Sequence, residues 1–294
     1  MLIFAPELRL QINKMKKLTF LSFAAALTAT MAFTSCDSDD NDNTMTGQTI
    51  SNMTSVVESL DNPGMVSFCD LSFALVYNYD NNTSNVQILG MKLADGSQLP
   101  LMTFNGLRWI TKDYWKLTES YNVTPTVEGF GNIPMFENFN IALKDLYSSQ
   151  GSYSPGFFYN FEINGSTRVY GPVYKGTTIT TAPGGATFTN DETKYVITFN
   201  SSSSTAKIEI FGASFIDGMP KLNLAFDAVP YTASGDRYVF SAASLTPSFG
   251  GTPFPRFPIT DLKATLDFAT GFDLEFTCGY NGQPYKVVAD TDRG

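Results

Sequence analysis

The feature of this chain that most constrains its fold is an internal repeat. Residues 78–96 read NYDNNTSNVQILGMKLADG, and residues 200–218 read NSSSSTAKIEIFGASFIDG, 122 positions later. The same offset pairs Gly90 with Gly212, Phe104 with Phe226 and Trp109 with Tyr231. Ordered matches over more than 100 residues indicate two homologous domains, which we expect at residues 46–170 and 171–294.

Small shifts of this offset extend the repeat toward both ends of each copy. They pair Phe139 and Ile141 with Phe257 and Ile259, Asn164-Gly165 with Asn281-Gly282, and residues 46–51 with residues 175–180. Each pair predicts two residues at equivalent positions in the two domains.

Both copies carry the pattern of β-strands. Apolar and polar residues alternate over residues 69–77, 262–268 and 272–278, which is the period of a strand with one buried face. The Asn-Gly pairs at 164–165 and 281–282 lie between such runs and predict tight hairpins. The sequence therefore predicts an all-β fold of two tandem antiparallel β-barrel-like domains, with β-sandwiches as the alternative.

Histidine is absent from the sequence, and this restricts the chemistry. Ser-His-Asp and Cys-His catalysis and the commonest zinc ligand are excluded, so we expect no enzyme, metal or cofactor. A glycosidase needs only two carboxylates, but no spacing here indicates such a pair. The net charge of −9 makes nucleic acid an unsuitable partner.

The beginning of the chain has the pattern of an export signal. Two lysines follow Met15, an apolar run covers residues 18–33, and Ser35-Cys36 precedes an acidic run at 37–42. The apolar run is too short to span a membrane comfortably. We expect a signal peptide at 1–35, with Met15 as an alternative start, and a flexible acidic tether at 36–45.

The Thr-Ser-Cys sequence at 34–36 resembles the lipobox of bacterial lipoproteins. This resemblance implies cleavage before Cys36 and attachment of lipid to Cys36. The acidic run after it resembles the surface-export signal of lipoproteins from Bacteroidota-type bacteria. The two resemblances imply a protein held by lipid in the outer membrane and facing the cell exterior.

A second resemblance concerns the domains themselves. Each copy begins with Gly-Thr-Thr (176–178) or Gly-Gln-Thr (47–49), has a hairpin tipped by Asn and Ser, continues through Met-Pro (219–220) or Leu-Pro (99–100), and ends with an Asn-Gly turn. This order resembles the calycin-like, lipocalin-like domains of Bacteroidota lipoproteins. It implies an antiparallel barrel of about eight strands, wide enough for a packed interior or one small ligand.

One aromatic cluster is a candidate ligand site. Arg108, Trp109, Tyr114 and Trp115 contain both tryptophans of the chain next to a cation. They would suit stacking of a sugar or a lipid. Packing within strands explains the same residues and is favoured, because Tyr231 replaces Trp109 in the second copy.

Cys69 and Cys278 are the other two cysteines of the chain, and the sequence allows two readings of them. An exported protein could join them in a disulfide. Both lie on the apolar phase of a strand, and Phe161 occupies the repeat position of Cys278, so buried free thiols are favoured. Asp95 and Asp217 precede glycines and are assigned to turns rather than to catalysis.

These observations together predict a surface lipoprotein that binds a small hydrophobic or glycan ligand without catalysis. The alternative is a structural or adhesive protein whose domains are packed and hold no internal ligand. A carboxylate glycosidase ranks third.

Overall fold

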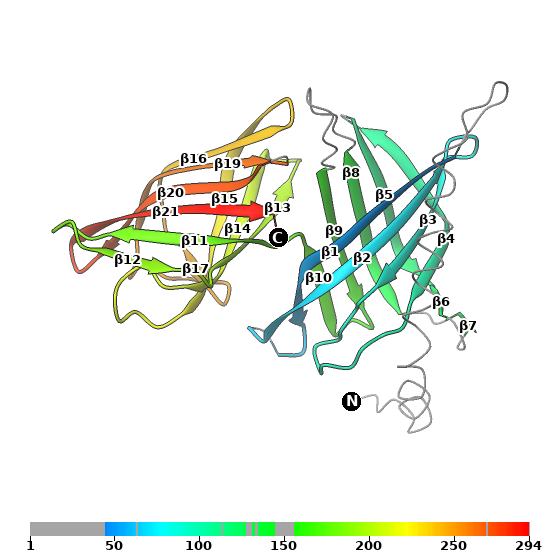
Figure 1. Ribbon diagram of the computed structural model, residues 1–294, viewed down its shortest axis with the longest axis horizontal. Helices are drawn as coiled ribbons and strands as arrows, with labels where there is room; N and C mark the ends of the chain where they lie inside the picture. Colours follow the sequence, from blue (N-terminus) through cyan, green and yellow to red (C-terminus); the bar gives the residue numbers. More distant parts are fainter. Residues whose placement is uncertain are drawn as a thin grey trace. The chain divides into compact units, whose positions relative to one another are not determined.

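The computed structural model describes residues 45–62, 64–112, 114–127, 131–132, 135–144, 156–268 and 270–293. These residues form strands and turns, with no helix among them. They divide into two compact units: residues up to Leu143 together with Phe157–Tyr170, and residues from Gly171 onward together with Lys144 and Gly156. Each unit contains one antiparallel sheet, and we call the two sheets barrel 1 and barrel 2 (Figure 1).

Ten strands build barrel 1. They are β1 (Met45–Ser59), β2 (Val66–Asn78), β3 (Thr83–Leu89), β4 (Met102–Lys112), β5 (Trp115–Val123), β6 (Thr126–Val127), β7 (Gly131–Asn132), β8 (Phe136–Lys144), β9 (Gly156–Ile163) and β10 (Thr167–Gly171). Around the sheet the order is β3-β2-β1-β10-β9-β8-β5-β4, and β3 also pairs with β4. That last pairing closes a ring of eight strands. The short hairpin β6–β7 extends from β4.

Eleven strands build barrel 2. They are β11 (Tyr174–Thr181), β12 (Thr187–Asn190), β13 (Lys194–Asn200), β14 (Thr205–Ala213), β15 (Leu222–Ser234), β16 (Arg237–Leu245), β17 (Ser248–Phe249), β18 (Thr252–Pro253), β19 (Ile259–Asp267), β20 (Gly271–Tyr280) and β21 (Gln283–Arg293). The ring order is β14-β13-β11-β21-β20-β19-β16-β15, closed by β14–β15. The hairpin β17–β18 extends from β15, as β6–β7 does from β4.

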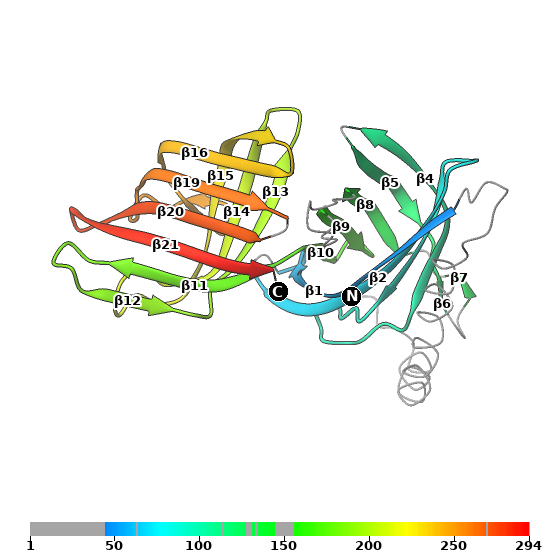
Figure 2. The same cartoon turned by 45° about the horizontal axis from the view of Figure 1, so that its top comes forward.

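The predicted fold class is confirmed in its barrel form. In each unit the sheet returns to its first strand, so it has no pair of separate facing layers, and the sandwich alternative is wrong (Figures 1 and 2). Neighbours around the ring are mostly consecutive in sequence, which describes an up-and-down meander. Closure also pairs strand edges that would otherwise be open.

Backbone geometry supports the offset of 122 at one turn of each barrel. Asn82 (φ 53°) and Ser204 (φ 51°) both have left-handed backbone. The carbonyl oxygen of each accepts a hydrogen bond from the backbone N–H of the residue 27 positions later, Trp109 or Tyr231, at 3.1 Å. The strands from β2 to β5 are therefore equivalent to those from β13 to β16.

The gapped match of Phe139 and Ile141 with Phe257 and Ile259 is wrong. Strand β19 has a bulge at Asp261 (φ 56°), and Asn138 in β8 has the same left-handed backbone (φ 49°). Aligning these two residues makes Phe136 equivalent to Ile259. A bulge adds one residue to a strand, so matching letters across it misplaces the register.

The match of residues 46–51 with 175–180 is also wrong. Ile50 is buried and pairs with Phe73, whereas Ile179 lies on the outer face with 45% of its surface exposed. The residue opposite Tyr195, which is equivalent to Phe73, is Tyr174. Residues 46–51 and 175–180 are similar in composition, since both are rich in small and hydroxylated residues, but they do not occupy equivalent positions in their strands.

The Asn-Gly hairpins are confirmed in both barrels. Asn164 (φ 52°) and Gly165 (φ 60°) join β9 to β10, and Asn281 (φ 50°) and Gly282 (φ 74°) join β20 to β21. Positive φ at both central residues defines the type I′ turn, whose twist suits two antiparallel strands. These turns set the register of the last hairpin of each barrel.

Aromatic rings fill the centre of barrel 1. Its largest fully buried side chains include six phenylalanines: Phe73, Phe104, Phe136, Phe139, Phe157 and Phe161. The ring centroids of Phe104 and Phe139 lie 4.7 Å apart, and those of Phe139 and Phe161 lie 5.6 Å apart. An eight-stranded barrel is just wide enough for such side chains. The middle of barrel 1 is a packed core.

Candidate functional site

The four residues of the predicted aromatic cluster do not form one site. Strand β4 directs Trp109 into barrel 1, where only 5% of its surface is exposed and its Nε1–H donates to the Thr83 carbonyl oxygen at 3.0 Å. Arg108 is the preceding residue of the same strand and is exposed. Consecutive residues of a strand face opposite sides of the sheet, so the side chains of Arg108 and Trp109 point away from each other.

Tyr114 and Trp115 lie away from Trp109. Tyr114 is at the β4–β5 turn with φ 69° and is 86% exposed. Trp115 pairs with Lys112 and packs against Phe158 of β9, with ring centroids 5.6 Å apart. That pair is on the outer face, since Phe157 on the opposite parity of β9 is fully buried. Packing explains Trp109 and Trp115 separately.

Trp109 belongs to a different cluster, which we call the barrel 1 ring cluster: Tyr77, Tyr79, Trp109 and Lys116. The rings of Tyr77 and Tyr79 meet Trp109 edge to face at centroid distances of 5.3 and 5.2 Å. The Lys116 Nζ lies 5.0 Å from the Tyr77 ring and 5.5 Å from the Tyr79 ring. Tyr79 and Lys116 therefore cover an end of the barrel whose inner rings, Tyr77 and Trp109, are buried.

The equivalent end of barrel 2 has a different cluster, which we call the barrel 2 ring cluster: Phe199, Tyr231 and Tyr238. Phe199 lies 5.1 Å from Tyr231 and 4.7 Å from Tyr238, and the two tyrosine rings lie 5.7 Å apart. All three rings are only half-buried. Below them Phe240, which is fully buried, lies 5.9 Å from both Phe199 and Tyr231. The three half-buried rings thus form a layer above the packed core.

The two clusters occupy the same strand positions. The repeat offset of 122 relates Tyr77 to Phe199, Trp109 to Tyr231 and Lys116 to Tyr238. At the fourth position Tyr79 is replaced by Ser201. Barrel 2 thus lacks both side chains that cover the end of barrel 1, and this loss explains the greater exposure of its rings.

The barrel 2 ring cluster combines apolar faces with phenol groups. Burial, together with the nearby Tyr238, raises the pKa of Tyr231 above its usual value of 10.0. The Tyr231 hydroxyl therefore stays protonated at neutral pH and can both donate and accept a hydrogen bond. Ring faces next to hydroxyl groups suit a ligand that has an apolar face and a polar edge.

Sequence reasoning missed the barrel 2 ring cluster, although a signal for it was present. The match of Trp109 with Tyr231 was used as evidence for ordinary packing. Extending the same offset to Tyr77 and Lys116 would have shown that barrel 2 replaces a cation with a third ring.

The remaining predicted residues have structural roles where the structure describes them. Cys69 and Cys278 are buried free thiols, as predicted, and burial raises the pKa of both, that of Cys278 to about 12. The Asp95 carboxylate accepts a hydrogen bond from the Ser97 N–H at 2.9 Å, which confirms its turn role. Cys36 and the acidic tether before residue 45 lie outside the described residues.

Neither a metal-binding cluster nor a membrane-spanning helix occurs among the described residues. No group of three or more acidic or cysteine side chains there is arranged to hold a metal ion. Within the same residues, no helix has the length and apolar character needed to cross a membrane.

Comparisons with known proteins leave the function open. No protein-family model and no curated protein matches the chain. A solved structure to which it is similar is a protein of unknown function from the DUF3598 family of Nostoc punctiforme. That match has 9% identity and a TM-score of 0.22, and covers 83% of this chain and 95% of the other. A likeness this weak supports no argument.

Proposed function

We propose that this chain is a non-catalytic binding protein for a small hydrophobic or glycan ligand, and that the barrel 2 ring cluster holds the ligand. We further propose that lipid on Cys36 anchors it in the outer membrane, facing the cell exterior. The anchor rests on the lipobox resemblance of residues 34–36 and the acidic run that follows. The absence of histidine favours binding over catalysis.

The observation that carries the binding proposal is the exposure of the rings in barrel 2. Phe199, Tyr231 and Tyr238 face the barrel axis but remain half-buried. Rings of this size normally bury most of their surface, since burying an aromatic side chain contributes about 1.5–3 kcal/mol. A ligand stacked on them would complete that burial, and the Tyr231 hydroxyl would bond its polar edge.

A second candidate function applies to barrel 1. The aromatic rings of barrel 1 pack against one another from its core to the end covered by Tyr79 and Lys116. A structural or adhesive role therefore suits barrel 1 better than the binding of an internal ligand. Under this proposal the two barrels divide the work, and barrel 1 presents its outer surface to a partner.

Native mass spectrometry of the full-length protein, purified from its own kind of bacterium, tests the binding proposal. We expect a non-covalent extra mass that disappears on unfolding, and its loss in the double variant Tyr231→Ala, Tyr238→Ala. The control is Tyr121→Ala, which removes a tyrosine that is 84% exposed in barrel 1. An extra mass that survives the double variant, or no extra mass in the unaltered protein, would refute the barrel 2 site.

The same spectra test the anchor. Lipidation adds a covalent mass that remains after unfolding and maps to Cys36. In a fractionation experiment Cys36→Ala is expected to move the protein out of the membrane fraction. A Cys36→Ala protein that stays with the membrane would contradict the proposed lipid anchor.

A further inference from the structure

Barrel 2 carries a proline-rich loop that the ring cluster does not involve. We call residues 253–258, Pro-Phe-Pro-Arg-Phe-Pro, the proline loop. The Phe254 N–H donates to the Pro247 carbonyl oxygen at 2.7 Å, and the Pro258 carbonyl oxygen accepts from the Gly279 N–H at 2.8 Å. Each proline fixes its own φ and restricts the residue before it. The loop is therefore tied at both ends and has few conformations to lose on binding.

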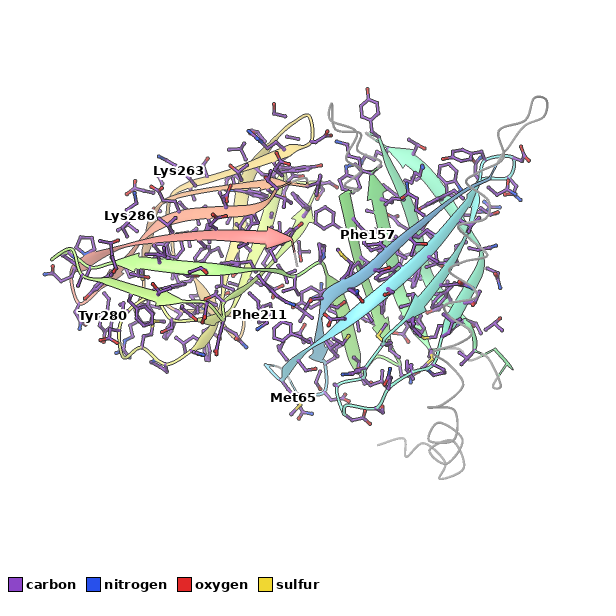
Figure 3. The ribbon with its side chains drawn as sticks, in the orientation of Figure 1. Met65, Phe157, Phe211, Lys263, Tyr280 and Lys286 are labelled. Atoms are coloured by element: carbon purple, nitrogen blue, oxygen red, sulfur yellow. The ribbon has the colours of Figure 1, made fainter. Side chains whose placement is uncertain are left out.

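The proline loop completes a row of four rings, namely Phe249, Phe254, Phe257 and Tyr280. Successive ring centroids lie 5.8, 5.5 and 5.3 Å apart, and the Phe257 and Tyr280 rings are nearly parallel, with an angle of 21°. Phe257 is buried and anchors the row, whereas Phe249 is 46% exposed. Figure 3 labels Tyr280 where β20 turns toward β21. The row thus passes from the exposed Phe249 through the half-buried Phe254 to the buried Phe257, and it ends at the half-buried Tyr280.

Arg256 lies over this row. Its guanidinium carbon is 5.8 Å from the Phe257 ring centroid and 5.4 Å from that of Tyr280. One of its amino groups donates to the Tyr280 hydroxyl oxygen at 3.1 Å. Arg256 is exposed, and the described part of the chain offers it no carboxylate partner within salt-bridge distance. A guanidinium has five donors, so most remain for a ligand.

The closed barrel does not require this arrangement. In barrel 1, Val127 occupies the position of Phe249 in the short hairpin strand, and Ile163 occupies that of Tyr280 before the Asn-Gly turn. The sequence from Thr126 to Phe136 contains no arginine. Barrel 1 nevertheless closes with the same strand order. One exposed ring, two half-buried rings and a cation with no carboxylate partner among the described residues are features that the fold does not need, and they point to recognition.

We propose that Arg256 and the ring row of Phe249, Phe254 and Tyr280 form a surface site for an acidic carbohydrate, a sugar bearing a carboxylate or sulfate group. The guanidinium would take the anionic group through paired N–H donors. The exposed rings would take the apolar C–H face of a sugar ring. An open row with a polar rim suits a ligand that stays partly in water. This site is separate from the barrel 2 ring cluster and does not depend on it.

The net charge of the chain means that any attraction for an anion must be local. The whole chain carries a net charge of −9, so its overall field repels acidic ligands. Binding of an acidic sugar would therefore depend on Arg256 itself rather than on a diffuse basic surface. A direct consequence is that one substitution should remove the selectivity for acidic over neutral sugars.

Calorimetric titration of the full-length protein tests this site. The probes are a galacturonate tetramer, a sulfated carrageenan tetramer and a neutral galactose tetramer. We expect at least one acidic probe to bind about tenfold or more tightly than the neutral one, as a charge-assisted pair predicts. Comparing the two acidic probes distinguishes carboxylate from sulfate. Equal affinity for all three, or no binding of either acidic probe, would overturn the proposal.

Three variants locate the binding. Arg256→Met is expected to weaken the acidic probe about tenfold or more, and Arg256→Lys to weaken it less, since the charge remains but the planar fork is lost. Lys263→Met removes the same charge from an exposed position of β19 and should leave affinity unchanged. An Arg256→Met protein that folds and keeps full affinity would refute the assignment.

Tyr280 supplies an independent readout. Its hydrogen bond from Arg256 and the Arg256 charge lower the pKa of Tyr280 below its usual value of 10.0. A bound carboxylate or sulfate would oppose both effects, so the pKa of Tyr280 should rise when the acidic probe is added. Difference spectra at alkaline pH measure this shift, with Tyr280→Phe identifying the signal. A pKa of Tyr280 that is the same with and without bound probe would place the probe elsewhere.

Discussion

The two barrels share one scaffold but end differently. Equivalent strand positions carry Tyr77, Trp109 and Lys116 in barrel 1, and Phe199, Tyr231 and Tyr238 in barrel 2. In barrel 1 a lysine and Tyr79 cover the rings, and the inner two are buried. In barrel 2 the same layer is aromatic and half-exposed. Closure of the eight-stranded barrel fixes the positions of the strands. The residue types at the strand ends can then differ between the two barrels.

A second contrast in the same direction appears at the short hairpins. Both barrels extend the same strand with a two-stranded hairpin, β6–β7 or β17–β18. Only the second is followed by the proline loop with its arginine and two phenylalanines. The two features that suggest recognition, the barrel 2 ring cluster and the proline loop, therefore both belong to barrel 2. In barrel 1 the equivalent rings are packed. The predictions below test this division.

The largest effect is expected in the cores. Phe161 of β9 and Cys278 of β20 each lie three residues before an Asn-Gly turn, and both are fully buried. Phe161→Ala should cost barrel 1 about 3–5 kcal/mol of unfolding free energy, because it leaves a large cavity. Cys278→Ala should cost barrel 2 only about 1 kcal/mol. Urea unfolding followed by peptide-resolved hydrogen exchange separates the barrels, and equal losses would contradict the contrast.

A smaller effect is expected where Lys116 covers barrel 1. Lys116→Ala should lower the unfolding free energy of barrel 1 by about 0.5–1 kcal/mol, the usual range for a partly exposed cation over rings. It should also expose Trp109. Acrylamide quenching of tryptophan fluorescence in a Trp115→Phe background measures that exposure. Lys112→Ala on the same hairpin is the control. If Lys116→Ala leaves the quenching unchanged, Lys116 does not shield Trp109 from solvent.

The smallest effect concerns charge on the outer face of barrel 2. Burial raises the pKa of Asp273 above its usual 3.8, aided by Asp290 and Asp267 and opposed by Arg237. The native state then keeps the proton to a higher pH than the unfolded state. The unfolding free energy of barrel 2 should therefore fall as pH rises from 3.8 through the raised pKa.

Asp273→Asn should remove that slope and stabilise barrel 2 at neutral pH. The gain should be no more than a few tenths of a kcal/mol, since the group is exposed and screened by solvent. Thermal unfolding between pH 3 and pH 7, read by peptide-resolved exchange, measures it. Asp61→Asn in barrel 1 is the control, and a variant that keeps the slope would show that other groups cause it.

Much of the fold could be predicted from local sequence patterns. Alternation identified the strands, and the two Asn-Gly pairs identified the last hairpins, because these features depend on neighbours in the chain. The ungapped offset of 122 also identified equivalent residues, as the left-handed Asn82 and Ser204 confirm. Matches that crossed a bulge failed, since one inserted residue changes the register without changing the pattern of letters.

The candidate sites were harder to predict. Arg108 and Trp109 are neighbours in sequence, yet a strand sends them to opposite faces. Lys116 and Tyr77 are far apart in sequence, and only the pairing of β2, β3, β4 and β5 around the ring brings them together. The proline loop is visible in the sequence as three prolines within six residues, but its contact with Tyr280 depends on the pairing of β19 with β20.

Local sequence patterns were enough to predict two tandem β-domains. Strand alternation and turn residues depend on neighbouring residues, and the repeat depends on a constant offset along the chain. All three can therefore be read from the order of the residues alone. Which rings are covered and which remain exposed could not be predicted in this way. That outcome depends on closure of each sheet, which brings side chains from distant strands together inside the barrel. There Tyr238 and Ser201 replace Lys116 and Tyr79, and the end of barrel 2 is left uncovered.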